Sequence, residues 1–165
     1  MNQRYLQNNP SSGRIAFVQS CWHKDIVDRC RDSFIEAIGR LGIAEDRIDV
    51  FAVPGAFEIP LQAKLLAKTG RYAAIVAAGF VVDGGIYRHE FVADAVIAAL
   101  MRVQLDTEVP VISAVLTPQR FHAHEEHHRF FREHFVVKGA EAAAACAATI
   151  DNLARLRQSA AERVA

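Results

Sequence analysis

The segment from residue 53 to residue 60 contains residue types that can bind a ligand through the backbone at the start of a helix. Its sequence is Val-Pro-Gly-Ala-Phe-Glu-Ile-Pro. Proline has no NH group and glycine allows unusual dihedrals, so the turn can present the NH groups of Ala56, Phe57 and Glu58 at a positive helix end. A polyol or an anion could bind there. Glu58 can also act as a simple cap that interacts with the helix dipole.

Trp22 is the only tryptophan of the chain, and it follows a short apolar run. At such a position the indole can stack flat on a heterocycle, because it offers a large planar face. A tryptophan that packs at a subunit interface would fit the position equally well. Both interpretations stay open from the sequence.

Residues 79–92 form another candidate segment, which combines a glycine turn with the start of a helix. Gly84 and Gly85 stand before that helix, where glycines let a phosphate approach the backbone. Arg88 stays protonated at physiological pH, so it can hold a phosphate or an enolate oxygen but cannot act as a general base. The glycine turn alone is a weak signal, because many loops contain two glycines.

Four histidines lie between residues 122 and 128, and this stretch also fits the H-E-x-x-H zinc pattern with His124, Glu125 and His128. A catalytic zinc needs a third protein ligand and a buried, apolar helix. This stretch is instead flanked by charged side chains. A solvated helix face is the simpler interpretation, so we predict no metal site and keep a zinc hydrolase only as a remote alternative.

The chain alternates between short apolar runs and helical patterns. Four runs predict strands that are buried on both faces, at residues 15–18, 48–53, 73–78 and 111–116. Helical spacing predicts helices over residues 26–41 and 56–68 and a third with an apolar face of Phe91, Ala95, Val96, Ala99, Leu100 and Val103. A fourth helix is expected to begin near Pro118, and a fifth to cover residues 140–157.

Strands that alternate with helices in this way form right-handed parallel crossovers. The expected fold class is therefore α/β, a three-layer α/β/α sandwich with a four-stranded parallel sheet. In such a sheet the ligand crevice lies beyond the carboxyl ends of the strands. Those ends would bring Trp22, residues 53–58, residues 79–85 and residues 116–118, which include Thr117 and Pro118, to one rim.

The composition indicates one soluble domain. The 165 residues, 52% of them hydrophobic, suffice for one core but not for two. Lys plus Arg and Asp plus Glu balance at 19 each, which favours neither nucleic acid nor a membrane as partner, and no apolar run approaches the roughly 20 residues that span a bilayer. Three cysteines without CxxC pairing and an amino terminus without a signal-peptide pattern indicate a cytoplasmic protein. We predict a flexible tail or arm at residues 1–13, one domain at 14–158 and a C-terminal tail at 159–165.

From about residue 15 to residue 153, these segments together resemble the lumazine synthase family. The 53–60 block resembles, residue for residue, the segment that holds the ribityl chain in that family. The resemblance implies condensation of 5-amino-6-(D-ribitylamino)uracil with 3,4-dihydroxy-2-butanone 4-phosphate to 6,7-dimethyl-8-ribityllumazine, the penultimate step of riboflavin synthesis. It implies two small-molecule substrates and no metal or redox cofactor.

The resemblance also assigns roles to individual residues. Trp22 stacks on the pyrimidine, and the ribityl chain contacts Ala56, Phe57 and Glu58. Phe80, Val81, Val82 and Ser113 contact the pyrimidine. Phosphate is held by Gly84, Gly85, His127 and Lys138, the last of these in a Lys-Gly pair that opens the final helix. For Lys138 taken alone, a solvated lysine is the simpler interpretation.

One departure from the family pattern affects catalysis. An ungapped match places Arg88 at the position of the usual catalytic histidine, and His89 stands one residue later, about 100° further around a helix. Tyr-Arg-His at this place and Trp22 at the stacking position resemble the second type of the family. The catalytic residues we predict are Arg88 and His89. A weakly active or non-catalytic assembly that binds lumazine or flavin is the alternative.

The resemblance further implies a homo-oligomer. Family members place the active site between neighbouring subunits of a pentamer, and the second type forms a dimer of pentamers. The sequence alone does not choose between a decamer and an icosahedral shell.

Overall fold

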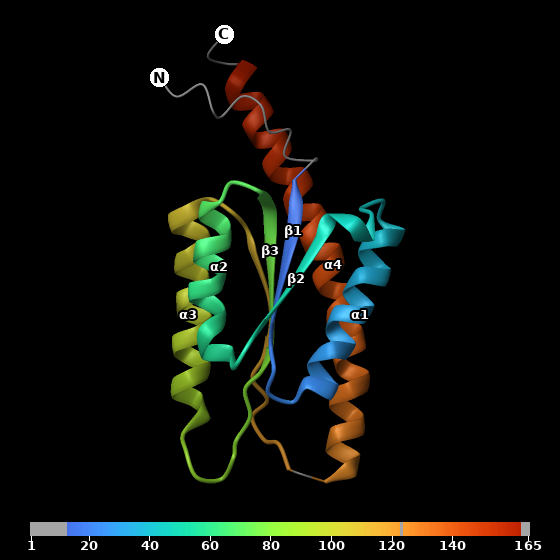
Figure 1. Cartoon of the computed structure of the whole chain (residues 1–165), viewed down its shortest axis with the longest axis vertical. Helices are drawn as coiled ribbons and strands as arrows, with labels where there is room; N and C mark the ends of the chain where they lie inside the picture. The colour runs from blue at the N-terminus through green and yellow to red at the C-terminus, as the bar shows by residue number, and fades with distance from the viewer. Residues whose placement is uncertain (1–12, 123, 163–165) are drawn as a thin grey trace.

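A sheet of four parallel strands forms the centre of the molecule in the computed structural model, which describes residues 13–122 and 124–162 (Figure 1). The strands are β1 (Arg14–Ser20), β2 (Ile48–Val53), β3 (Tyr72–Phe80) and β4 (Val111–Leu116), in the order β2-β1-β3-β4. Every predicted apolar run became one of these strands. All three pairings are parallel, so the carboxyl ends of the strands lie at one edge of the sheet.

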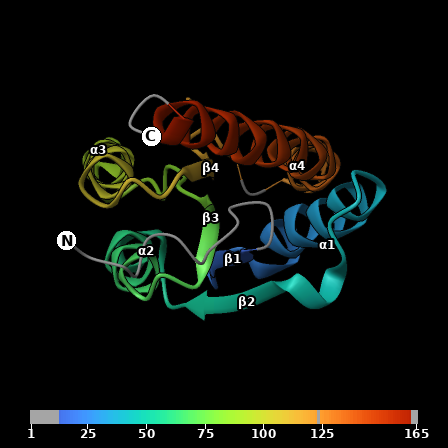
Figure 2. The ribbon, with the colours of Figure 1, turned by 90° about the horizontal axis from the view of Figure 1, so that it is seen from above.

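Helices cover both faces of this sheet, which confirms the predicted three-layer sandwich. Figure 2 shows α2 (Ile59–Lys68) and α3 (His89–Thr107) on one side, and α1 (Lys24–Arg40) and α4 (Glu125–Glu162) on the other. Each face carries its own apolar core, one under α1 and α4 and one under α2 and α3. In the part of the chain that the structure describes, no helix is long and apolar enough to cross a membrane.

β2 differs from the prediction that each strand is buried on both faces. β1 and β3 are buried almost throughout, as central strands of a covered sheet should be. β2 pairs only with β1 among the described residues, and Val50 on it is 44% exposed. The apolar run was correct as a sign of a strand but does not distinguish a central position from the edge of the sheet.

The carboxyl-terminal helices were predicted wrongly, because α4 is a single helix over residues 125–162 where we expected one helix near Pro118 and another at 140–157. Gly139 lies inside α4 and does not open it. A Cβ atom placed on Gly139 would lie 2.3 Å from the Cys30 carbonyl oxygen, so the glycine serves close packing of α4 on α1 and not a break. α4 also continues past residue 158, where we placed the end of the domain.

α3 buries a narrower face than predicted. Val96, Leu100 and Val103 are buried, but Phe91 is 67% exposed and Ala95 is exposed as well. The first turn of α3 therefore stands away from the core. The expected amino-terminal tail, except for Gly13, lies outside the described residues, so its role stays a prediction.

Candidate active site

The four strand ends deliver the predicted site segments to one rim, at the lower end of the molecule in Figure 1. Two backbone hydrogen bonds join neighbouring ends. The Cys21 NH donates to the Val53 carbonyl at 2.9 Å, and the Val81 NH donates to the Leu116 carbonyl at 2.9 Å. These bonds join the ends of β1 and β2 and the ends of β3 and β4, and the pairing of β1 with β3 up to Gln19 and Ala78 links the two halves of the rim.

The turn after β2 has the form that its sequence predicted. Pro54 and Gly55 lead into a short 3-10 turn, η4 (Ala56–Glu58), which continues into α2. The Gly55 NH donates to Glu58 Oε2 at 2.8 Å, so the Glu58 carboxylate caps the helix start. The second carboxylate oxygen of Glu58 makes no hydrogen bond within the described part of the chain and can accept one from a ligand.

Trp22 projects from the turn between β1 and α1. Its side chain is 71% exposed, which is unusual for a tryptophan in a domain of this size. Such exposure suits stacking on a ligand and also suits burial by another subunit. On the turn after β2, Phe57 is exposed while Ala56 is buried.

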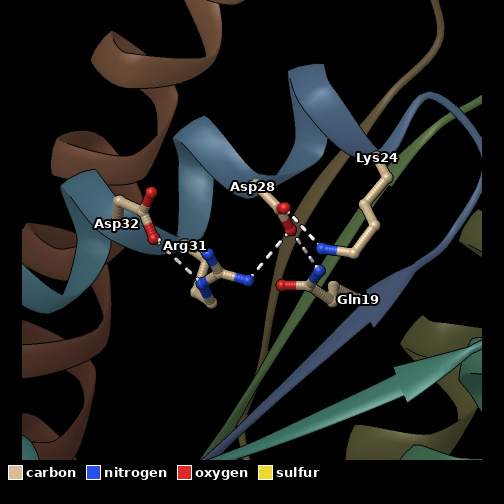
Figure 3. A network of polar contacts seen from close by, with 5 residues as sticks. All are labelled: Gln19, Lys24, Asp28, Arg31 and Asp32. Carbon is tan, nitrogen blue, oxygen red and sulfur yellow. Dashed lines mark hydrogen bonds and ion pairs between the residues drawn. The ribbon is translucent and has the colours of Figure 1, made fainter.

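The exit of β1 is held from the α1 side by a polar network, shown in Figure 3. The Gln19 side chain is buried, and its amide donates to Asp28 at 2.7 Å. Asp28 also accepts from Lys24 and from Arg31. Burial raises the pKa of Asp28, but the hydrogen bonds from Lys24 and Gln19 and the charge of Arg31 outweigh it and lower that pKa overall. The network fixes the strand immediately before the turn that carries Trp22.

Phe80 reaches the rim with its backbone only. Its side chain is 3% exposed and packs edge-on against Phe121 and Phe135 in the core under α4. Any contact of Phe80 with a pyrimidine is therefore made by main-chain atoms. Val81 is buried too, whereas Gly84 and Gly85 are exposed, and Gly85 has a φ of 76° that favours glycine.

Arg88 and His89 lie at the start of α3. The Arg88 guanidinium lies over the Phe91 ring, 5.6 Å from its centroid, in the geometry of a cation–π contact. The His89 side chain is only 12% exposed, and its Nδ1 lies 3.6 Å from Glu90 Oε2. Arg88 is the extended N-cap of α3 and His89 is its first residue, so the two are not related by the helical turn of about 100° that the sequence suggested.

His89 lines a cavity of about 320 Å³ between the start of α3 and the exit of β4. Glu90, Ala93 and Gln119 also line it, together with Thr117 and Pro118. Sequence reasoning brought Thr117 and Pro118 to the rim but missed Glu90 and Gln119 as lining residues. In the sequence, only their positions beside a helix start and a strand end could have indicated that they line the site.

Three predicted ligand contacts lie on β4 and α4 and not on the turns that form this rim group. Ser113 is exposed on β4, two strands away from β1. His127 lies in the first turn of α4, where its Nδ1 accepts from the His122 NH at 3.2 Å, which leaves Nε2 to donate to a ligand. Lys138 lies in the middle of α4 and pairs with Glu141 at 2.6 Å.

The distance along α4 separates His127 from Lys138. A helix rises about 1.5 Å per residue, so these residues lie roughly 16 Å apart along one continuous axis. The structure therefore does not bring both side chains of one chain to the same phosphate. The expectation that Lys138 opens a helix was wrong, because Gly139 after it is an internal packing position.

The zinc pattern finds no support in the geometry. Glu125 pairs with Arg132 at 3.6 Å, and the His128 ring packs edge-on against Phe121 at 5.1 Å. Over residues 13–122 and 124–162, no three His, Cys, Asp or Glu side chains gather as metal ligands would. These residues serve helix packing and surface ion pairs.

A parallel three-layer α/β fold whose polar and aromatic residues collect beyond the strand ends has the architecture of proteins that bind small molecules at such a rim. The chain belongs to the 6,7-dimethyl-8-ribityllumazine synthase family, whose model matches residues 12–154.

Three bacterial relatives cover most of the chain. The 6,7-dimethyl-8-ribityllumazine synthase of Rhodococcus erythropolis is 66% identical over 146 residues, which is 88% of this chain and 94% of the relative. The 6,7-dimethyl-8-ribityllumazine synthase 2 of Pseudomonas syringae pv. tomato is 63% identical, over 88% of this chain and 85% of the relative. The 6,7-dimethyl-8-ribityllumazine synthase 2 of Bradyrhizobium diazoefficiens is 61% identical, over 92% of this chain and 91% of the relative.

Proposed function

We propose that this protein condenses 5-amino-6-(D-ribitylamino)uracil with 3,4-dihydroxy-2-butanone 4-phosphate to 6,7-dimethyl-8-ribityllumazine, with release of phosphate and water. The observation that carries the proposal is the family match over residues 12–154, which spans all four strand ends of the rim. Relatives with 61–66% identity that bear the name of this enzyme support it. The protein would act in the cytoplasm, in the penultimate step of riboflavin synthesis.

The reaction suits a site that has residues for binding but no strong general base. The aromatic amine of the pyrimidine attacks the ketone to form an imine with loss of one water, phosphate leaves by elimination, and the ring closes with loss of a second water. Each step is favourable once both reactants are held together, so much of the acceleration comes from positioning. Proton transfer by side chains adds typically about a hundred- to ten-thousandfold.

The side of the rim near β1 and β2 binds the ribitylamino pyrimidine. Trp22 stacks on the ring with its exposed indole. The turn at Ala56 and Phe57 supplies backbone NH groups, and the oxygen of Glu58 that does not cap Gly55 accepts from a ribityl hydroxyl. Main-chain atoms from Phe80 to Val82 contact the ring edge, because the Phe80 side chain is committed to the core.

The side of the rim near the start of α3 binds the phosphate-bearing substrate. Gly84 and Gly85 form an exposed turn that a phosphate can approach closely. The Arg88 guanidinium, which rests on Phe91, supplies a permanent positive charge. His127 can donate through Nε2. Lys138 and His127 of one chain are too far apart to bind the same phosphate. If both contact it, Lys138 comes from a different chain.

His89 is the group that we assign to proton transfer. It lies one residue after the permanently charged Arg88 and lines the cavity beside Thr117 and Gln119. An imidazole can accept and donate protons near neutral pH, which a guanidinium cannot. Arg88 would stabilise the leaving phosphate while His89 moves protons.

A homo-oligomer, a pentamer or a dimer of pentamers, would complete the site. Two helices that lie side by side each expose an apolar stripe. On α3 it consists of Ile97, Met101 and Leu105, four residues apart, and on α2 of Leu61 and Leu65. A neighbouring subunit that covers these stripes can bring its own Ser113, His127 or Lys138 to the pocket. This arrangement explains why those side chains lie on β4 and α4 and not on the turns that form the rim group.

One specific observation favours a second candidate function. Arg88 occupies the place of the usual catalytic histidine, but its guanidinium lies over the Phe91 ring and is not among the groups that line the cavity beside His89. A protein that only binds lumazine or flavin would fit this feature. In that case Arg88→His would create activity in a protein that has almost none, whereas an active wild-type enzyme would exclude the alternative.

Paired variants test the assignment of the two sides of the rim. Trp22→Ala should raise KM for the pyrimidine about 3- to 10-fold, because a stacked ring contributes about 0.5–1.5 kcal/mol and 1.4 kcal/mol is tenfold. Arg88→Ala should act chiefly on KM for the phosphate-bearing substrate. Steady-state kinetics with each substrate varied in turn measures both. Equal effects of either variant on both substrates would contradict the assignment.

A further inference from the structure

His23 has a backbone conformation that its residue type does not favour. It lies between β1 and α1 with φ 51° and ψ 47°, the left-handed region, and it makes no side-chain cap hydrogen bond. Such a conformation in a residue other than glycine costs on the order of 1–3 kcal/mol and persists only where the surroundings enforce it. The surroundings of His23 should therefore show what enforces it.

The imidazole of His23 is wedged into an aromatic cluster. Its ring centroid lies 5.4 Å from Phe80 and 5.4 Å from Phe121, and both contacts are edge-on. The His128 ring from α4 lies 6.2 Å away on another side. Because Phe80 and Phe121 are themselves buried, the wedge is anchored to the core and holds the strained backbone in place.

Two anchors then fix the turn that carries Trp22. On one side, the Cys21 NH donates to the Val53 carbonyl at 2.9 Å. On the other side, the His23 carbonyl accepts from the NH groups of Ile26 and Val27, at 2.9 and 3.0 Å, and so begins α1. Trp22 stands between these anchors with its side chain 71% exposed.

We propose that His23 is a positioning residue for the pyrimidine subsite, in which the neutral imidazole between Phe80 and Phe121 fixes the turn that presents Trp22, and protonation releases that turn. The identity of the stacked ligand rests on the proposed function. The coupling between His23 and Trp22 rests only on the geometry of this chain.

The charges that face His23 favour the neutral imidazole near neutral pH. Burial between the aromatic rings is the main cause that lowers the pKa of His23, and the His128 imidazole on α4 lowers it further. Asp25 on α1 opposes both, but Asp25 is paired with Arg132 at 3.1 Å, and Arg132 also contacts Glu125. Phe80 from β3 and Phe121 bring no charge.

The sign of the pH effect follows from this lowered pKa. The released state, in which the imidazole is in water, takes up a proton at the ordinary histidine pKa, whereas the wedged state resists protonation until a lower pH. The wedged state is therefore fully favoured above the ordinary pKa and is progressively lost as the pH falls toward the lowered one. The pyrimidine subsite should weaken in the same window.

The single tryptophan makes the proposal measurable without any substrate. We expect the fluorescence anisotropy of Trp22 in the intact wild-type protein to fall as the pH is lowered through and below the ordinary histidine pKa, while the helical circular dichroism stays constant. His23→Asn tolerates the left-handed backbone but lacks the ring, so its anisotropy should be low at every pH. His23→Phe keeps a ring that cannot be protonated, so its anisotropy should not respond to pH in this window.

Further variants separate this explanation from a general loss of structure. His128→Phe keeps the ring but removes the neighbouring charge, so the midpoint of the anisotropy change should move to higher pH. In the kinetic arm, His23→Asn should raise KM for the pyrimidine about 3- to 10-fold and leave KM for the phosphate-bearing substrate within about twofold.

Several results would overturn the proposal. They are a flat anisotropy profile in the wild type, an unchanged transition in His23→Phe, or a loss of helical signal that accompanies the transition. Failure of the proposed function alone would look different, because the anisotropy arm would still succeed while no lumazine forms from the two substrates.

Discussion

Gly139→Ala tests the packing of α4 on α1 most sharply. An alanine Cβ at this position would lie 2.3 Å from the Cys30 carbonyl oxygen, 2.8 Å from Ser33 Cβ and 2.9 Å from the Phe34 nitrogen. Two of these atoms belong to the α1 backbone, which cannot move aside as the end of a side chain can. The two helices must therefore separate, or α4 must bend.

The expected change in the free energy of unfolding combines two opposing effects. Overpacking of a close-packed site costs about 1–3 kcal/mol, and three contacts this short place Gly139→Ala at the upper end, about 3 kcal/mol. Alanine is favoured over glycine inside a helix by about 1 kcal/mol. The net expectation is a loss of about 2 kcal/mol in the free energy of unfolding, or about 4–8 °C in Tm for a domain of this size.

Urea and thermal unfolding at one fixed protein concentration measure this loss, with Gly39→Ala as the matched control. Gly39 also lies inside a helix, on α1, but a Cβ atom there would meet nothing within 4 Å. Gly39→Ala should leave stability unchanged or raise it by up to about 1 kcal/mol. If Gly139→Ala gained stability as Gly39→Ala does, α4 would not approach α1 as closely as described, and the reasoning about a continuous packed helix would fail.

Two further predictions concern the residues that support the rim. Glu58→Ala removes the acceptor of the Gly55 NH, so it should lower the free energy of unfolding by about 1 kcal/mol in urea titrations, and an unchanged midpoint would disprove the cap. Asp28 has a lowered pKa, so its contribution to stability is present above the ordinary aspartate pKa and is lost as the pH falls through the lowered one. Asp28→Asn should therefore flatten the acid side of the pH–stability profile, and an identical profile would contradict the network.

The strands and the rim could be predicted because their signals are local. A short apolar run between turn residues indicates a buried strand, and Pro-Gly before a helix indicates a turn with free NH groups, whatever the rest of the chain does. These signals placed β2 and β4 correctly and gave the turn at residues 53–58 its observed form. The parallel direction of the strands then followed from their alternation with helices and the length of the connections.

The remaining features depend on contacts between distant parts of the chain. In the sequence, Gly139 belongs to a Lys-Gly pair that suggests the opening of a helix, and only the approach of α1 shows that it is a packing position. Phe80 stands at a strand end, yet three phenylalanines from later segments and His23 enclose its ring. The left-handed conformation of His23 has no sequence signal, because histidine does not require it. On α3, an apolar stripe turned away from the core cannot be told from the buried one by periodicity alone.

The central claim is that this rim brings a ribitylamino pyrimidine and a phosphorylated butanone together for condensation. The most direct test is the initial rate at which lumazine absorbance appears when the purified wild-type protein is given both substrates, with blanks that lack the protein or either substrate. The account predicts a rate proportional to protein concentration and well above the spontaneous reaction. A rate equal to that of the protein-free blank would contradict it.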